Sequence, residues 1–137
     1  RIRRHFRRLE ASLVKEAGEN ELAVAARIMG TAKYFADPSR LHGGESVPAL
    51  TGAYSPRQVA EQILGIFMAV KTVRIAFHDL AITVTGDHAT VNTTVEATGT
   101  LHSGEKLREA RELVCTLRKV EGDWRFAGCR IVDVLTR

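Results

Sequence analysis

The stretch GDHATVNTTVEAT, residues 86–98, decides the fold of this chain. Its first three residues include Gly and Asp, which are common in tight turns, and every second position after them is apolar or small. Those positions are Ala89, Val91, Thr93, Val95 and Ala97. Alternation with a period of two is typical of an antiparallel strand with one buried face and one solvated face. The stretch therefore predicts such a strand directly after a turn.

The sequence on both sides of this stretch has the same alternating pattern. Upstream, the alternation that includes Phe77 resumes at Leu80 out of phase. The slip at His78-Asp79 predicts a β-bulge, in which one extra residue bends the strand. Downstream, residues 107–119 and 126–134 predict two more strands. The second half of the chain is therefore predicted to form four consecutive antiparallel strands.

The last two predicted strands are joined by a turn at Glu121-Gly122-Asp123-Trp124. We place Gly122-Asp123 at its centre, because type II′ turns prefer Gly at the first central position. In that register Arg130 lies beside Cys115 on the inner face while Cys129 points outward, so we expect two free thiols. A three-residue turn would instead place Cys115 directly opposite Cys129 and allow a disulfide.

The first half of the chain is predicted to be mostly helical. Apolar residues recur at helical spacing over residues 2–17, and a second helix is predicted over residues 21–35. Residues 36–54 contain several Gly and Pro and predict a long loop, with room for a short strand near 46–50. A third helix over 55–70 begins with a serine cap followed by proline.

Length and composition fit one domain that spans residues 1–137. The chain is 45% hydrophobic and 26% charged, as in soluble globular proteins, and it has no apolar run long enough to span a membrane. Much of the net charge of +4 comes from five arginines among the first eight residues. We interpret them as a solvated helix face, and the alternative is a surface for phosphate or for a membrane. Aromatic residues do not alternate with these arginines, so no nucleic-acid partner is expected.

The compartment is left open by the sequence. Because the chain begins with Arg rather than Met, we expect residues upstream of it. A signal segment among them would export the domain, and a membrane anchor would hold the five arginines close to a membrane. Two cysteines fit an oxidising or a reducing compartment equally well.

The predicted order of three helices and a curved antiparallel sheet resembles the cone-shaped α+β fold of the nuclear transport factor 2-like superfamily, which includes SnoaL-like and ketosteroid isomerase-like proteins. The resemblance rests on the helix at 55–70, HDLAITV at 78–84, GDHATV at 86–91 and LRKVEGDWRF at 117–126. It implies that three N-terminal helices pack in a curved sheet of four to six antiparallel strands, around an apolar cavity. It leaves the function open, because this fold hosts enzymes, transport adaptors and binding modules.

The resemblance implies that several side chains line that cavity. The apolar candidates for a ligand pocket are Phe67, Phe77, Val91, Val95, Leu113 and Phe126. The polar candidates are Tyr34, Thr93, Arg111 and Arg130. We interpret Arg111, Arg130 and Glu109 as side chains that pair in solvent at the end of the sheet. The alternative is a patch that binds a carboxylate-bearing ligand through the planar arginine fork.

We therefore predict a non-catalytic module that binds a small hydrophobic or carboxylate-bearing ligand, or a protein. No histidine pair has the spacing of metal ligands, and no cofactor is expected. The alternative is a small isomerase or lyase with a hydrophobic substrate and with Glu109 or His78 as a weak candidate for the base. That alternative needs one of these side chains inside a closed pocket. The polar outer face of the predicted sheet is a candidate surface for a homodimer.

Overall fold

The structure is a computed structural model, and it describes residues 1–132. The helices are α1 (Ile2–Ser12), α2 (Glu21–Met29), the 3₁₀ segment η1 (Gly30–Tyr34) and α3 (Pro56–Met68). The strands are β1 (Val14–Lys15), β2 (Phe35–His42), β3 (Thr51–Tyr54), β4 (Thr72–Thr85), β5 (His88–Thr100), β6 (Lys106–Val120) and β7 (Asp123–Val132). The end of the last predicted strand, at 133–134, lies outside the described residues.

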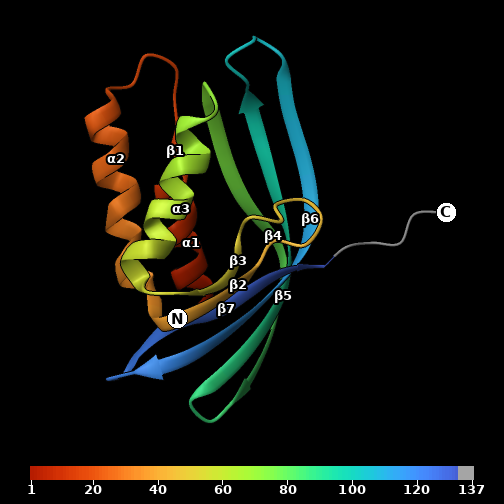
Figure 1. The fold of residues 1–137 in the computed structure, drawn as a ribbon. Helices are drawn as coiled ribbons and strands as arrows, with labels where there is room; N and C mark the ends of the chain where they lie inside the picture. Colours follow the sequence, from red (N-terminus) through yellow and green to blue (C-terminus); the bar gives the residue numbers. More distant parts are fainter. Residues whose placement is uncertain (133–137) are drawn as a thin grey trace, which may run out of the picture.

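All seven strands belong to one sheet in the order β1-β4-β5-β6-β7-β2-β3, and the three α-helices gather on one side of it (Figure 1). Strands β4 to β7 are the four consecutive antiparallel strands that the sequence predicts. The α+β prediction is thus confirmed. Two details differ from it: the sheet exceeds the expected four to six strands, and β2 runs parallel to β7.

Strand β3 and all but the first residue of β2 lie within residues 36–54, which we predicted to be a loop. The single helix expected over residues 21–35 is replaced by α2 and η1, and β2 begins where that helix should have ended. The sequence of β2, FADPSRLH, has no apolar alternation to mark a strand. The strand forms because β7 pairs with it, and the buried Ser39 hydroxyl donates to the carbonyl of Phe126 at 3.0 Å. Strand β3 follows the position near 46–50 where we placed a short strand.

The first helix is shorter than predicted. We expected it over residues 2–17, but α1 ends at Ser12 and the chain then pairs with β4 as β1. Lys15 of β1 is buried, and its ammonium donates to the carbonyls of Phe67 at 3.0 Å and Val70 at 2.7 Å. These carbonyls lie at the C-terminal end of α3, where a cation complements the negative pole of the helix. Lys15 therefore ties β1 to α3.

Helix α3 begins with the predicted serine and proline. The Ser55 hydroxyl accepts from the backbone N–H of Gln58 at 3.2 Å, and the Gln58 side chain accepts from the backbone N–H of Ser55 at 2.8 Å. This reciprocal pair is a capping box, which satisfies two N–H groups that the helix would otherwise leave unpaired. The start of the helix that covers the sheet is thereby determined by local sequence.

Aromatic rings from four elements meet at the centre of the core. Phe6 of α1 lies 5.2 Å from Phe77 of β4 and 5.0 Å from Phe126 of β7, measured between ring centroids. Phe35 of β2 lies 5.4 Å from Phe126. Both contacts of Phe6 are edge-to-face, a geometry that aromatic quadrupoles favour. The first helix is therefore held against β4 and β7, and Phe126 connects this cluster to β2.

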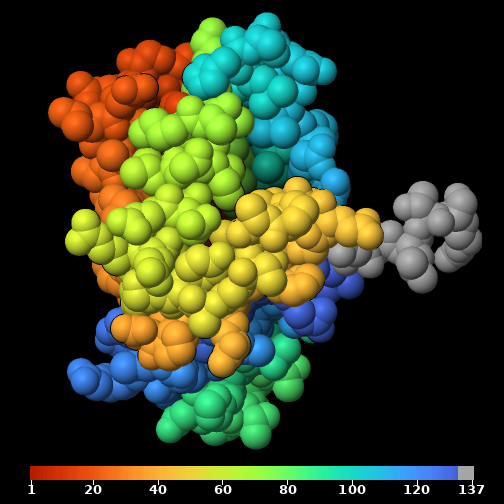
Figure 2. All heavy atoms as spheres, in the orientation of Figure 1, coloured from red at the N-terminus to blue at the C-terminus, as the bar shows by residue number. Residues whose placement is uncertain are grey.

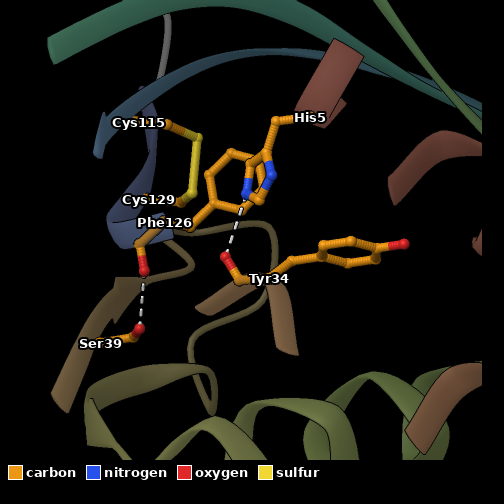
Figure 3. The surroundings of a disulfide bond; sticks show 6 residues. All are labelled: His5, Tyr34, Ser39, Cys115, Phe126 and Cys129. Carbon is orange, nitrogen blue, oxygen red and sulfur yellow. Dashed lines mark hydrogen bonds between the residues drawn. A yellow bond between two sulfur atoms is a disulfide. The ribbon is translucent and has the colours of Figure 1, made fainter. Parts of the chain in front are cut away.

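The β6–β7 hairpin has a different register from the one that we predicted. Its two turn residues are Glu121 and Gly122, both with positive φ, as type I′ turns require, so the turn lies one residue earlier than expected. The register then shifts further along the hairpin, and Cys115 lies directly opposite Cys129. The two form a disulfide (Figure 3), so the prediction of free thiols was wrong. A change of register by one residue exchanges the two faces of a strand.

Candidate functional site

A cavity of about 670 Å³ lies between α3, the loop from β2 to β3, and the sheet, and we call it the cone cavity. Its volume is within the range of small-molecule sites. Figure 2 shows the surface hollowed where α3, the gold-coloured loop and β6 meet. Its apolar wall includes Leu13, Leu41, Val47, Leu50, Ile63, Ile66, Phe67, Val70, Val73, Ile75, Phe77, Val95, Ala97, Leu107, Leu113 and Ile131.

The loop at 43–50 forms one wall of the cone cavity. Its turns are held by backbone bonds from Val47 N–H to the Gly43 carbonyl and from Leu50 N–H to the Val47 carbonyl, both at 3.0 Å. A Cβ atom at position 43 would lie 1.9 Å from the carbonyl oxygen of Val47, so only glycine fits there. This close approach places the side chains of Val47 and Leu50 on the cavity.

Gly43 and Cys129 also line the cavity, and the polar side chains among its described lining residues are His42, Ser46, Glu109 and Arg111. All four are partly or largely exposed, so they lie at the open end of the cone cavity, where it meets solvent. The Arg111 guanidinium bonds to Glu109 at 2.6 Å and donates from Nε to the Ser46 hydroxyl at 2.8 Å. Arg111 therefore links the loop to β6 and already has a carboxylate as its partner.

Five of the ten side chains that we predicted for the pocket line the cone cavity: Phe67, Phe77, Val95, Arg111 and Leu113. Three others lie in the core instead. Val91 and Phe126 are fully buried, and the buried Thr93 hydroxyl donates to the carbonyl of His78 at 2.6 Å. Their positions on the inner face were predicted, but other core side chains cover them.

The remaining two predicted residues lie elsewhere. Tyr34 lines a second concavity beside α1, described below. Arg130 was placed on the inner face beside Cys115, and this prediction was wrong. It pairs with Val114, is exposed, and lies on the opposite face of the sheet, because the hairpin register differs from the expected one.

The two weak candidates for a catalytic base lie at the surface. The predicted bulge is confirmed, since the register shifts between His78 and Ala81 and Asp79 has φ of 57°. The His78 side chain is 50% exposed and lies 3.1 Å from Glu96. Glu109 is 52% exposed at the open end of the cone cavity. Neither side chain is enclosed by apolar walls, as the base of the enzymatic alternative would have to be.

A second concavity, of about 610 Å³, lies between α1, η1 and the β6–β7 turn, and we call it the cationic groove. It is lined by Arg1, Arg4, His5, Arg8, Lys33, Tyr34, Gly122, Asp123, Trp124 and Arg125. None of the described residues lines both this groove and the cone cavity. The sequence pointed to its arginines but not to their neighbours, which come from two later segments.

His5 is the buried polar side chain of this groove. Its Nε2 donates to the carbonyl of Tyr34 at 3.1 Å, and its ring lies 4.6 Å from the ring of Phe126 (Figure 3). Burial lowers the pKa of the imidazole below its usual value of 6.5. The charges of Arg8 and Arg125 lower that pKa further, while the Tyr34 carbonyl and Asp123 oppose the shift.

The lowered pKa of His5 predicts a loss of stability in mild acid. The folded protein binds this proton more weakly than the unfolded chain, so unfolding takes up a proton as the pH falls below about 6.5. The stability contribution is present above that pH and is lost as the pH falls toward the folded-state pKa. We expect the urea midpoint to drop between pH 7.5 and pH 5.5 by more in the wild type than in His5→Gln. An equal drop in both proteins would contradict this assignment.

Comparison with solved structures finds close matches in fold at low sequence identity. A nuclear transport factor 2-like protein from Salmonella enterica aligns with a TM-score of 0.73 at 15% identity, over 98% of this chain and 89% of that one. The chain has the nuclear transport factor 2-like fold. A Kribbella flavida protein, Kfla4162, has a TM-score of 0.76 at 16% identity, over 95% and 86% of the two chains. A Shewanella frigidimarina protein, provisionally named a ketosteroid isomerase, has a TM-score of 0.66 at 15% identity, over 94% and 92%.

Comparison by sequence gives no match, in contrast to comparison by structure. The sequence matches no protein-family model and no curated protein. The structural matches include proteins of unknown function and others with provisional enzyme names, so they establish the fold and leave the specific role undetermined. None of the described helices is long and apolar enough to cross a bilayer. Within residues 1–132, no three His, Cys, Asp or Glu side chains come together as a metal site would require.

Sequence reasoning missed the part of the cone cavity that the loop at 43–50 contributes. The length of that segment and its glycines were visible, and long loops are often functional. Which side chains face inward was not visible, because Val47 and Leu50 are oriented by the loop's backbone bonds and not by a periodic pattern.

Proposed function

We propose that this domain binds a small, largely apolar molecule in the cone cavity and does not transform it. One observation carries the proposal: the wall is apolar throughout, while the polar side chains of the described residues gather at its open end. Such a site removes apolar surface of a ligand from water, which contributes about 25 cal/mol per Å² buried. The polar end then orients the ligand.

The contacts of Arg111 favour a neutral ligand head over a carboxylate. The guanidinium already holds Glu109 at 2.6 Å, so a ligand carboxylate would have to displace it or lie beside another negative charge. A hydroxyl or carbonyl group can instead use the donors of Arg111 that remain free for it. The proposed ligand is therefore an apolar molecule with one neutral polar group.

The enzymatic alternative, an isomerase or lyase, needs an acid or base inside the closed part of the cavity. The two side chains considered for that role, Glu109 and His78, are both at the surface. The provisional names of solved structures with this fold include an isomerase and an aromatic ring hydroxylase, which keeps that alternative as a second candidate.

The test is fluorescence titration with the neutral probe 1-aminoanthracene. We expect saturable binding to the wild type and at least a tenfold loss of affinity in Val95→Trp, since the indole takes up part of the cavity that the ligand would occupy. Tenfold corresponds to about 1.4 kcal/mol. The matched control is Val84→Trp, at an exposed position outside the cavity lining. Thermal unfolding of both variants confirms that they are folded, and Ala97→Trp provides a second filled cavity.

Two results would count against the proposal. One is the absence of saturable binding to the wild type, and the other is equal affinity of Val95→Trp and Val84→Trp. Displacement of the probe by dodecanol and by dodecanoate tests which polar head the ligand carries. Dodecanol should displace the probe from the wild type at a lower concentration than dodecanoate, and Glu109→Gln should raise the affinity for dodecanoate several-fold. If dodecanoate already competes better in the wild type, the preference for a neutral head is wrong.

A further inference from the structure

The five arginines at the start of the chain are Arg1, at the N-cap of α1, and four within the helix, and they divide into two sets with different surroundings. Arg3 donates to the carbonyl of Leu80 at 3.3 Å, and Arg7 donates to the carbonyl of Phe77 at 3.0 Å and pairs with Glu10 at 3.0 Å. These two side chains bind the helix to β4. The other three are the arginines at positions 1, 4 and 8, which line the cationic groove. Their spacing of three and four residues places them on one helix face.

Two further cations reach the groove from distant segments. Lys33 comes from η1 and Arg125 from β7, so three elements place five cations around one concavity. Among residues 1–132, the one carboxylate in the lining is that of Asp123. Within the part of the chain that the structure describes, none of these five cations has an ion pair with a carboxylate. Like charges gathered without counter-charges create a positive potential that attracts anions.

Arg125 adds a second and independent observation. It is half-buried, and its Nε is excluded from solvent with no hydrogen-bond partner among the described residues. The other guanidinium nitrogens of Arg125 are not enclosed and have no hydrogen-bond partner within residues 1–132. Their N–H groups therefore remain available to an acceptor that enters the cationic groove.

We propose that the cationic groove binds a soluble organic phosphate carrying at least two negative charges. Guanidinium groups bind phosphate oxygens through paired, charge-assisted hydrogen bonds, and Lys33 adds a point charge. The rings of Tyr34 and Trp124 line the same concavity and offer apolar surface to the organic part of the ligand. This site is separate from the cone cavity, so the two can be occupied independently.

The shape of the site favours a soluble ligand over a membrane surface. The cations surround a concavity of about 610 Å³, and the guanidinium of Arg125 is half-buried within its lining. A flat membrane surface contacts cations that project outward from the protein, whereas a small molecule can also enter a concavity and contact the cations that line it. Binding to anionic vesicles is therefore the competing outcome of the test.

His5 provides an internal reporter of occupancy. It faces Arg8 on its own helix, Arg125 and Asp123 on β7, and the carbonyl of Tyr34, with Arg4 and Lys33 lining the same groove. A bound dianion would offset the arginine charges that disfavour its proton, so the pKa of His5 should rise on binding. Sulfate is a suitable probe for this measurement, because its charge does not change between pH 5 and pH 8.

The experiment is calorimetric titration of the chain with pyrophosphate and with ADP. We expect one saturable site, with ADP bound at least as tightly as pyrophosphate because its organic part contacts the rings. The Arg4→Ala/Arg8→Ala variant should lose at least tenfold in affinity. The matched control is Arg57→Ala/Arg108→Ala, which removes the same charge from two exposed side chains outside the groove and should change affinity less than twofold. All four side chains are exposed, so both variants should fold.

Three outcomes of the binding experiments would overturn the proposal. The first is the absence of saturation by either phosphate, and the second is equal weakening in the two double variants, which would indicate non-specific attraction. The third is binding to phosphatidylserine-containing vesicles that Arg4→Ala/Arg8→Ala abolishes, with no response to ADP, which would assign the groove to a membrane. An NMR titration in which sulfate leaves the pKa of His5 unchanged would also contradict it.

Discussion

Replacing Phe126 with alanine is expected to lower the free energy of unfolding by about 4 kcal/mol, the largest effect of any single substitution considered for this protein. The ring is 1% exposed and packs against Phe6, Phe35 and His5. It therefore joins α1, β2 and β7, and its removal leaves a cavity that the surrounding sheet and helix cannot fill. The measurement is urea unfolding followed by circular dichroism.

Leu22→Ala serves as the control for Phe126→Ala. Leu22 is 81% exposed on α2, so its truncation should change the free energy of unfolding by less than about 0.5 kcal/mol. A loss below about 1 kcal/mol in Phe126→Ala would mean that the aromatic cluster does not hold the first helix against the sheet. His5 contacts the same ring, so the variant should also alter the cationic groove.

Reduction of the disulfide between Cys115 and Cys129 is expected to cost about 3 kcal/mol of stability. The bond closes a loop with a sequence separation of 14 residues, and cross-linking a loop of about 15 residues restricts the unfolded chain by roughly this amount. Urea unfolding with and without reductant measures the difference in the free energy of unfolding between the oxidised and reduced forms of the same protein. Cys115→Ala/Cys129→Ala provides the control, since its stability should not respond to reductant.

Alkylation provides the direct check of the disulfide. The oxidised protein, denatured without reductant, should gain no mass from iodoacetamide, and the reduced protein should gain two carbamidomethyl groups. Two groups added before reduction would show free thiols and remove the physical basis of the stability prediction. A disulfide of this kind persists in oxidising compartments and is rare in reducing ones, so the result also bears on where the domain works.

The cone cavity and the cationic groove differ in how far the sequence reveals them. Part of the apolar wall of the cone cavity could be predicted from the sequence. Val95 and Leu113 belong to strands in which apolar and polar residues alternate, and Phe67 belongs to the apolar face of a helix. The cationic groove was visible only as five arginines on one helix. Which of them face Arg125 and Lys33 depends on how α1 lies against η1 and β7, which the sequence pattern of α1 does not specify.

The amino-acid sequence by itself determined the elements whose signals are local. Strands β4 to β7, the bulge after His78 and the capped start of α3 follow from a two-residue period, a phase slip and a serine-proline cap, all of which operate within a few residues. Only the tertiary structure decided β2 and β3, the partner of Cys115 and the two binding sites. These depend on contacts between segments far apart in the chain, where β7 supplies the hydrogen bonds that make β2 a strand. A slip of one residue in a hairpin also exchanges its inner and outer faces, and local sequence does not resolve that choice.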